Sequence, residues 1–136
     1  MTGVQTCALP ICKTLGVRVL DSEAGAVTME VSLQTEGRVL GVAEATVWTY
    51  WSKTRPDGSM YGEGKGVMTT KDGEVIGLLG SGTAKVAGLD GTVHYRGAIY
   101  FNTTAAKYAK LNGTAGVHEY EVSAAGSLTT KVWEWK

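Results

Sequence analysis

Hydrophobic and polar residues alternate with a period of two along most of the chain. In the stretch VTMEVSL, Val27, Met29, Val31 and Leu33 fall on one face, and threonine, glutamate and serine residues fall on the other. Successive side chains of a β-strand point to opposite faces of its sheet, so this alternation predicts strands with one buried face. The pattern recurs in every long segment and indicates an all-β protein.

Seven short segments rich in turn-forming residues divide the chain into strands. They span 23–26, 36–38, 55–59, 71–74, 88–92, 105–114 and 124–127. Several contain Asp-Gly or Asn-Gly, which favour tight hairpins because these residues adopt positive φ at low cost. The strands expected between them span 13–22, 27–35, 38–53, 60–70, 74–87, 92–103, 114–123 and 127–135. The segment 38–53 is long for one strand, so we expect a bulge or bend at Gly41, and we expect 104–111 to form a long loop with at most a short helix.

Eight strands joined mostly by short turns favour a closed barrel over a sandwich. A sandwich normally needs long Greek-key connections, and only 104–113 is long enough to be one. A meander barrel needs no long connection and leaves no open strand edge. The glycine-rich runs YGEGKG at 61–66 and GLLGSG at 77–82 would permit the strong coiling that closure requires. We therefore expect a single eight-stranded antiparallel up-and-down β-barrel over 13–136.

Composition narrows the classes of function. The chain of 136 residues has 43% hydrophobic and 19% charged residues, which is typical of a globular domain. Its 13 basic and 13 acidic residues give a formal net charge of zero, without a basic cluster, which argues against binding nucleic acid. No apolar run approaches the roughly 20 residues of a membrane-spanning helix. We therefore expect no nucleic-acid partner and no membrane span.

The first twelve residues, MTGVQTCALPIC, do not look like protein-coding sequence. Residues 1–11 resemble, residue by residue, the translation of a widely used short-read sequencing adapter with GTG read as the start codon, and Cys12 shares a codon with its last base. We expect 1–12 to be a non-native segment that replaces the natural amino terminus, where a signal peptide could have stood. Cys7 and Cys12 then say nothing about the compartment of the protein.

Several longer runs resemble a group of small uncharacterised microbial proteins. These runs are WTYWSKTRPDGSMYGEGKGVMTTKDGE, YRGAIYF, LNGTAGVHEYEV and VWEWK. That group looks related to the allene oxide cyclase barrel, which is lipocalin-like (calycin-like). The resemblance covers nearly all of 13–136 and implies the barrel fold, with a further β-forming stretch before Lys13. It carries no catalytic motif across and leaves the function open.

Common catalytic and cofactor motifs are absent from the sequence. The runs GEGKG and GLLGSG lack the Gly-Lys-Ser/Thr ending of a phosphate-binding loop. His94 and His118 are the only histidines and lie 24 residues apart, without the close ligand spacing of a metal site. No nucleophile elbow is present. We expect neither a metal nor a cofactor.

A group of aromatic and ionisable residues within the strands is the best candidate for a site in the barrel lumen. The candidate ligand-binding residues are Glu44, Trp48, Tyr50, Tyr61, Arg96, Tyr100, His118 and Tyr120, and Glu63 is the candidate catalytic acid or base. A carboxylate in an apolar lumen would have a raised pKa suited to proton transfer. For the strand 92–103, apolarity slightly favours an orientation that would exclude two of these candidates from the lumen. Val93, Tyr95, Ile99 and Phe101 would then face inward, and Arg96 and Tyr100 would face outward.

Three functions remain compatible with this barrel. The first, which we favour, is the binding of a small apolar or amphipathic molecule in the lumen. The second is a cofactor-independent enzyme of the cyclase or isomerase type, with a luminal carboxylate as acid or base. The third is a structural protein with a packed lumen whose outer face forms a homo-oligomer.

Overall fold

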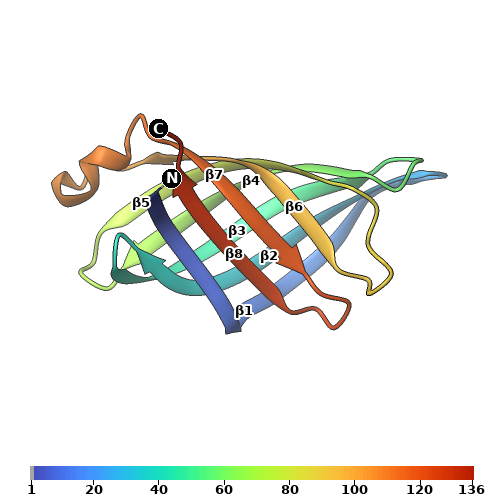
Figure 1. Cartoon of the computed structure of the whole chain (residues 1–136), viewed down its shortest axis with the longest axis horizontal. Helices are drawn as coiled ribbons and strands as arrows, with labels where there is room; N and C mark the ends of the chain where they lie inside the picture. Colours follow the sequence, from blue (N-terminus) through green and yellow to red (C-terminus); the bar gives the residue numbers. More distant parts are fainter. Residues whose placement is uncertain (1) are drawn as a thin grey trace.

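The computed structural model describes the backbone of residues 2–136 and the side chains of residues 12–136. The side chains of 1–11, most of the segment that we expect to be non-native, lie outside the described residues. Eight strands and one 3₁₀ helix, η1 (Ala106–Leu111), make up the fold (Figure 1). The strands are β1 (Thr2–Glu23), β2 (Ala26–Val39), β3 (Val42–Thr54), β4 (Met60–Thr70), β5 (Val75–Ala84), β6 (Val93–Asn102), β7 (Ala115–Val122) and β8 (Leu128–Glu134).

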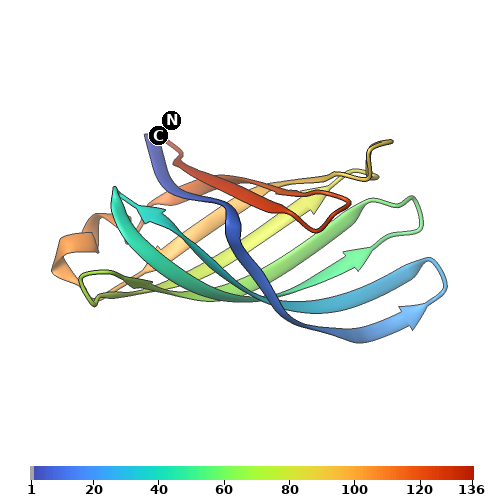
Figure 2. The same ribbon diagram turned by 90° about the horizontal axis from the view of Figure 1, so that it is seen from below.

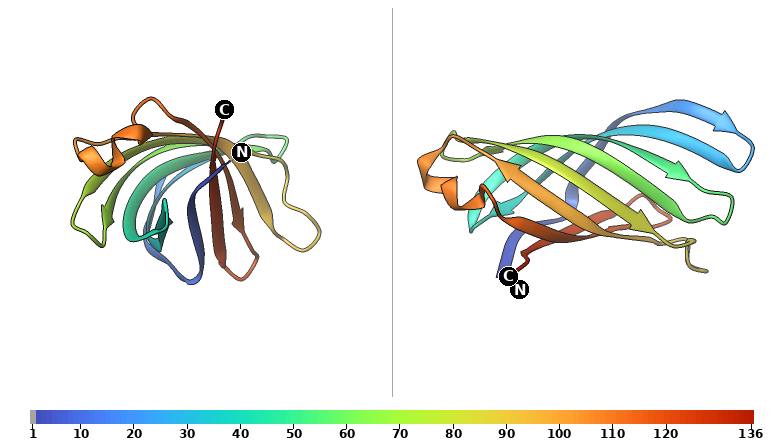
Figure 3. Two further views of the ribbon diagram at one scale, coloured as in Figure 1. Left: turned by 60° about the vertical axis from the view of Figure 1, so that its left-hand side comes forward. Right: turned by 90° about the horizontal axis from the view of Figure 1, so that it is seen from above.

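The strands form one strongly curled antiparallel sheet in chain order. Each strand pairs with the next one in the sequence, and the two views of Figure 3 show how the sheet curls about its long axis. The first residues of β1, Thr2 to Cys7, also pair with Thr130–Glu134 of β8, and the two chain ends lie close together in Figure 1. The prediction of an all-β protein with eight antiparallel strands is therefore confirmed.

The turn between β2 and β3 was misplaced by the sequence pattern. It was expected at 36–38, but β2 continues through Val39 and the chain reverses at Leu40 and Gly41. Both residues have positive φ, 48° and 82°, as a tight hairpin turn requires. Leu40 is the only non-glycine residue in this conformation among the described residues. Because leucine seldom adopts it, the turn was hidden, and Gly41 was taken for a bulge or bend.

One end of the sheet is filled by a hydrophobic core. Tyr108 and Leu111 of η1 are buried and pack in one cluster with residues from the inner faces of the strands. Those residues include Val39, Met68, Ile76, Leu78, Ile99 and Phe101. In Figure 1, η1 lies at the left end, beside the turn that joins β4 to β5. We call this the closed end.

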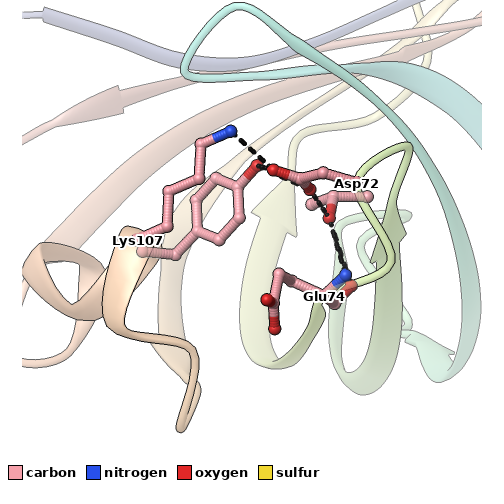
Figure 4. A network of polar contacts seen from close by, with 5 residues as sticks. Asp72, Glu74 and Lys107 are labelled. Atoms are coloured by element: carbon pink, nitrogen blue, oxygen red, sulfur yellow. Dashed lines mark hydrogen bonds and ion pairs between the residues drawn. The ribbon is translucent and has the colours of Figure 1, made fainter.

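A polar network anchors η1 to the β4–β5 turn (Figure 4). Lys107 Nζ lies 2.5 Å from Asp72 Oδ2, and the buried Tyr108 hydroxyl donates to the same carboxylate at 3.1 Å. The Thr70 hydroxyl also donates to Asp72 and accepts the Glu74 backbone N–H at 3.0 Å. These bonds, first the one from Lys107, lower the pKa of Asp72 to about 2. The network holds the apolar residues of η1 against the end of the sheet.

The opposite end is open. From Cys12 to Glu23, β1 pairs with β2 alone, whereas its first residues pair with β8. Figure 2 shows β1 diverging from β8 along this length. Val17 and Val19 pair with the inward residues Val31 and Met29, yet they are 56% and 59% exposed. The inner face of the β1–β2 hairpin is therefore an accessible apolar surface at this open end.

Candidate ligand cavity

A cavity of about 120 Å³ lies within the open half of the curled sheet. Seven strands, β2 to β8, contribute to its wall, which is mainly apolar and aromatic. It begins where the core of the closed end stops, since Ile99 and Val132 belong both to the core cluster and to the cavity wall. A single chain therefore builds a filled half and a hollow half from one set of strands.

Glycines on the inner face of β4 and β5 provide the space. Gly62, Gly64, Gly80 and Gly82 line the cavity, and Gly66 follows them on the same face of β4. Because a glycine leaves only backbone on its face of the strand, bulky side chains from neighbouring strands can lie over it. The glycine-rich runs YGEGKG and GLLGSG therefore leave part of the inner face of β4 and β5 without side chains.

Large side chains from neighbouring strands occupy this glycine floor. A Cβ placed on Gly66 would stand 2.8 Å from the Trp48 indole, and one on Gly64 would stand 2.6 Å from Tyr50 Cβ. A Cβ placed on Gly80 would stand 3.6 Å from the far edge of the same indole. Trp48 therefore lies across β4 and β5 as one wall of the cavity.

Three tyrosines form the wall towards the open end. The rings of Tyr50 and Tyr120 meet edge to face with centroids 6.4 Å apart, and Tyr95 lies 5.7 Å from Tyr120. Ser52 Oγ lies 3.2 Å from the Tyr95 hydroxyl, which donates to Met60 Sδ at 3.3 Å. Burial raises the pKa of Tyr50 and of Tyr120, so their phenols stay protonated and uncharged at neutral pH.

His118 is the one imidazole in the described wall. It projects from β7, and its Nε2 lies 2.8 Å from the backbone carbonyl oxygen of Ser81 on β5. A carbonyl oxygen only accepts hydrogen bonds, so Nε2 carries the proton. A Cβ on Gly97 would stand 2.8 Å from this nitrogen, so the glycine makes room for the ring. Burial lowers the pKa of His118, which keeps the ring neutral and leaves Nδ1 as a proton acceptor.

Four of the sequence-predicted residues line this cavity from inward positions, namely Trp48, Tyr50, His118 and Tyr120, and a fifth, Glu63, also borders it although its side chain is exposed. Glu44 also faces inward and is 5% exposed, but it lies towards the closed end of β3. The Thr46 hydroxyl donates to its carboxylate at 2.5 Å. Glu44 is not among the residues that line this cavity, so the structure does not bring it together with the other candidates.

The other four predicted residues lie on the outer face. Glu63, the candidate acid or base, is exposed and accepts a 2.6 Å hydrogen bond from Tyr61. Arg96 lies 3.5 Å from Glu119, its cross-strand neighbour, and Tyr100 is 50% exposed. The expectation that Glu63 is a luminal carboxylate is therefore wrong, because the inward positions of β4 belong to its glycines. Glu63 borders the cavity between Gly62 and Gly64, but its carboxylate is bonded to Tyr61.

The sequence interpretation missed Tyr95, Ser52, Leu33 and Ile99 as wall residues. Apolarity had favoured the inward orientation of Val93, Tyr95, Ile99 and Phe101, and the burial of β6 confirms it. The same parity should have added Tyr95 to the site in place of Arg96 and Tyr100. Ser52 shares the face of Trp48 and Tyr50, so alternation along β3 could also have identified it.

No three His, Cys, Asp or Glu side chains among the described residues come together as metal ligands would. No helix in the described chain has the length and apolarity needed to cross a membrane.

Comparison with known proteins relates the chain to solved structures only. No protein-family model matches the sequence, and no curated protein matches it significantly. A conserved protein of unknown function from Rhodopseudomonas palustris is similar with a TM-score of 0.78 and 16% identity, over 98% of this chain and 95% of that one. A protein of unknown function from Clostridium acetobutylicum has a TM-score of 0.83 and 12% identity, over 99% and 98%. At these identities the likeness shows a shared fold.

Proposed function

We propose that the protein binds a small apolar or amphipathic molecule in the cavity at its open end. The observation that carries this proposal is the cavity itself, which the glycines of β4 and β5 leave open between Trp48 and three tyrosines in place of a packed core. A concave apolar space with a few polar groups is the usual form of a small-molecule site. The accessible Val17 and Val19 would extend it along the β1–β2 hairpin for the apolar part of a longer ligand.

We further propose that the curled sheet is a closed calycin-like barrel related to the allene oxide cyclase barrel. The pairing of Thr2–Cys7 with β8 and the meander order of the strands support closure. In this proposal, the segment that resembles a translated adapter stands where the natural protein has its own strand. Expression of a natural gene with an intact upstream region would test this, since a native β-forming segment should occupy the same place.

An isomerase or cyclase is the second candidate function, and its base would be His118 in place of Glu63. A neutral imidazole with one nitrogen fixed by Ser81 resembles the arrangement of general bases, and the phenols beside it could donate to a substrate oxygen. A structural barrel with a packed lumen is less well supported, because side chains fill only the closed half.

Native mass spectrometry of the freshly purified protein tests the binding function. We expect a co-purified molecule whose mass disappears after unfolding and refolding. Titration of the extracted molecule into the refolded protein should change the fluorescence of Trp48, the tryptophan that lines the cavity. A Trp48→Phe variant identifies the origin of that change. A protein that carries no ligand and gives no response to a library of apolar compounds would contradict the proposal.

A further inference from the structure

Nδ1 of His118 is an accessible hydrogen-bond acceptor in an apolar wall. The ring makes one hydrogen bond, from Nε2 to Ser81. Among the described residues, no buried side-chain nitrogen or oxygen lacks a partner, and His118 has no further polar contact. Nδ1 has no partner, so it must keep accessible surface. Since the ring belongs to the cavity wall, a molecule in the cavity can reach this atom.

The cavity offers no described positive charge to an anion. Its ionisable side chains that face inward are His118 and the three tyrosines. Burial raises the pKa of Tyr50 and Tyr120 and lowers that of His118, which favours the uncharged forms of these three groups. Arg96 is exposed on the outer face and lies 3.5 Å from Glu119. A buried carboxylate or phosphate without a counter-charge loses its hydration and gains little in return. An uncharged molecule is therefore the better occupant.

The volume sets the size of what can be fully enclosed. A cavity of about 120 Å³ is comparable to the engineered apolar cavities of roughly 150 Å³ that accept benzene. Trp48 and the tyrosines offer ring edges and faces, which suit a planar aromatic or similarly compact ring. A larger molecule would place one ring here and the remainder along the open end.

Resting on the proposed function, we infer that the cavity recognises an uncharged ring-sized group that donates one hydrogen bond to Nδ1 of His118. A phenol is the simplest molecule of this class. The hydroxyl of the ligand would satisfy Nδ1, while the fixed Nε2–H···O contact to Ser81 holds the imidazole in the tautomer that accepts. The ring of the ligand would lie against Trp48 over the glycines of β4 and β5.

Four probes of similar size test the inference: phenol, anisole, toluene and benzoate. Their dissociation constants are measured by following backbone amide shifts of Gly80 and Gly82 in ¹H–¹⁵N spectra. We expect phenol to bind about 5- to 10-fold more tightly than anisole or toluene, because one hydrogen bond is gained, and benzoate to bind most weakly. Equal affinity for phenol and anisole, or tightest binding of benzoate, would overturn the inference and leave the proposed binding function standing. Binding of none of the probes, with a co-purified ligand still present, would overturn the inference alone; the absence of both would overturn the proposed function too.

A His118→Phe variant and its matched control, His94→Phe, locate the effect. His94 lies on the outer face, where its Nδ1 is 3.0 Å from Glu121. We expect the preference for phenol over anisole to vanish in His118→Phe, with toluene binding retained, and to persist in His94→Phe. Loss of the preference in both variants, or in neither, would refute the role of His118.

Should His118→Phe fail to fold, the wild-type protein at lower pH gives the same information. Protonation of Nδ1 turns the acceptor into a donor, so the phenol preference should fall away as the pH is lowered, with toluene binding unchanged. On the strands packed against the ring, β5 presents Ser81 and Gly82 and β8 presents Val132, none of which titrates. β6 presents Gly97, with Arg96 beside it on the outer face, and Tyr120 follows on β7, where burial raises the pKa of its phenol. A phenol preference that stays constant while the ring of His118 takes up a proton, as followed by its own ¹H–¹⁵N signals, would contradict the inference.

Discussion

The indole of Trp48 lies so close to Gly66 that any side chain at this glycine would displace it. A Cβ at Gly66 would stand 2.8 Å from Trp48 Cδ2 and 3.0 Å from two further ring atoms. Gly66 pairs directly with Trp48 across β3 and β4, so the glycine and the tryptophan act as one unit of the wall. The size of the cavity therefore depends on a residue that has no side chain.

Gly66→Ala should destabilise the protein by about 1–3 kcal/mol, because the indole must leave its position in a packed wall. Urea unfolding measures the loss, and a change in Trp48 fluorescence should accompany it. Gly80→Ala is the matched control, since its Cβ would touch the same indole at an ordinary 3.6 Å. An equal effect of both substitutions would contradict this account of the wall.

Gly80→Val should abolish binding of the co-purified ligand without loss of the fold, because its methyl groups would occupy the cavity from the floor. Gly77→Val offers a control on the same strand, as Gly77 lies on the opposite face, where a Cβ would meet Asn102 O at 3.4 Å. Native mass spectrometry and the melting temperature of each variant provide the measurements. Ligand retained by Gly80→Val would place the binding site elsewhere.

Asp72→Asn should lower the melting temperature at neutral pH by removing the charge that pairs with Lys107. The pKa of Asp72 is about 2 in the folded chain, below the ordinary value of 3.8. The unfolded chain therefore binds the proton first, and the stabilisation is present above pH 4 and lost as the pH falls towards 2. Melting curves from pH 7 to pH 2 should show the wild-type advantage shrinking over that window. Lys107→Met should remove the same advantage, and an unchanged difference at pH 2 would refute the assignment.

His118 should make the fold less stable in mild acid. Burial lowers its pKa below the ordinary 6.5, so the unfolded chain takes up a proton before the folded one does. Its contribution is complete above pH 6.5 and declines as the pH falls from there towards the lowered folded pKa. Denaturant midpoints between pH 8 and pH 5 test this by comparing the wild type with His118→Phe, in which this decline should be absent. A decline of the same size in both proteins would assign it to other groups.

Variants of Tyr108 distinguish the stability that comes from packing from the stability that comes from hydrogen bonds at the closed end. Tyr108→Phe keeps the ring in the core and loses the hydrogen bonds to Asp72, at a cost of about 1–3 kcal/mol. Tyr108→Ala also empties a fully buried site and should cost about 3–5 kcal/mol. Guanidinium unfolding ranks the two, and equal losses would show that the ring contributes nothing to the core.

Most of the fold could be predicted from the sequence because strands and tight turns are determined by residues that are close together in the chain. Hairpin turns such as the one at Gly73 combine a turn-forming dipeptide with a change in alternation, and the observed strands follow them closely. The exception is the turn at Leu40–Gly41, which depends on an unfavourable leucine conformation that the surrounding pairing of β2 with β3 imposes. Residue preferences predict no turn at Leu40, so the sequence pattern placed the turn at Gly37 instead.

The site was only half predictable, because alternation gives two faces without saying which is inside. Trp48 and His118 were assigned to the correct face, whereas Glu63 was chosen for its chemistry although the glycines beside it occupy the inward positions. When every second residue of a strand is glycine, the face without side chains is the inner one, because bulky side chains of neighbouring strands pack over it. That rule would have placed Glu63 outside and drawn attention to Tyr95, which faces the same space from β6.

The two ends of the sheet differ in packing, and this difference determines where the protein opens locally. Amides near η1 are shielded by a core and an anchored turn, whereas β1 beyond Cys12 has one neighbouring strand and exposed valines. Local opening is easiest where few apolar contacts must be broken. Backbone amides should therefore exchange first in the β1–β2 hairpin and last in the β4–β5 turn. A ligand would enter the cavity beside the hairpin, where the wall opens first.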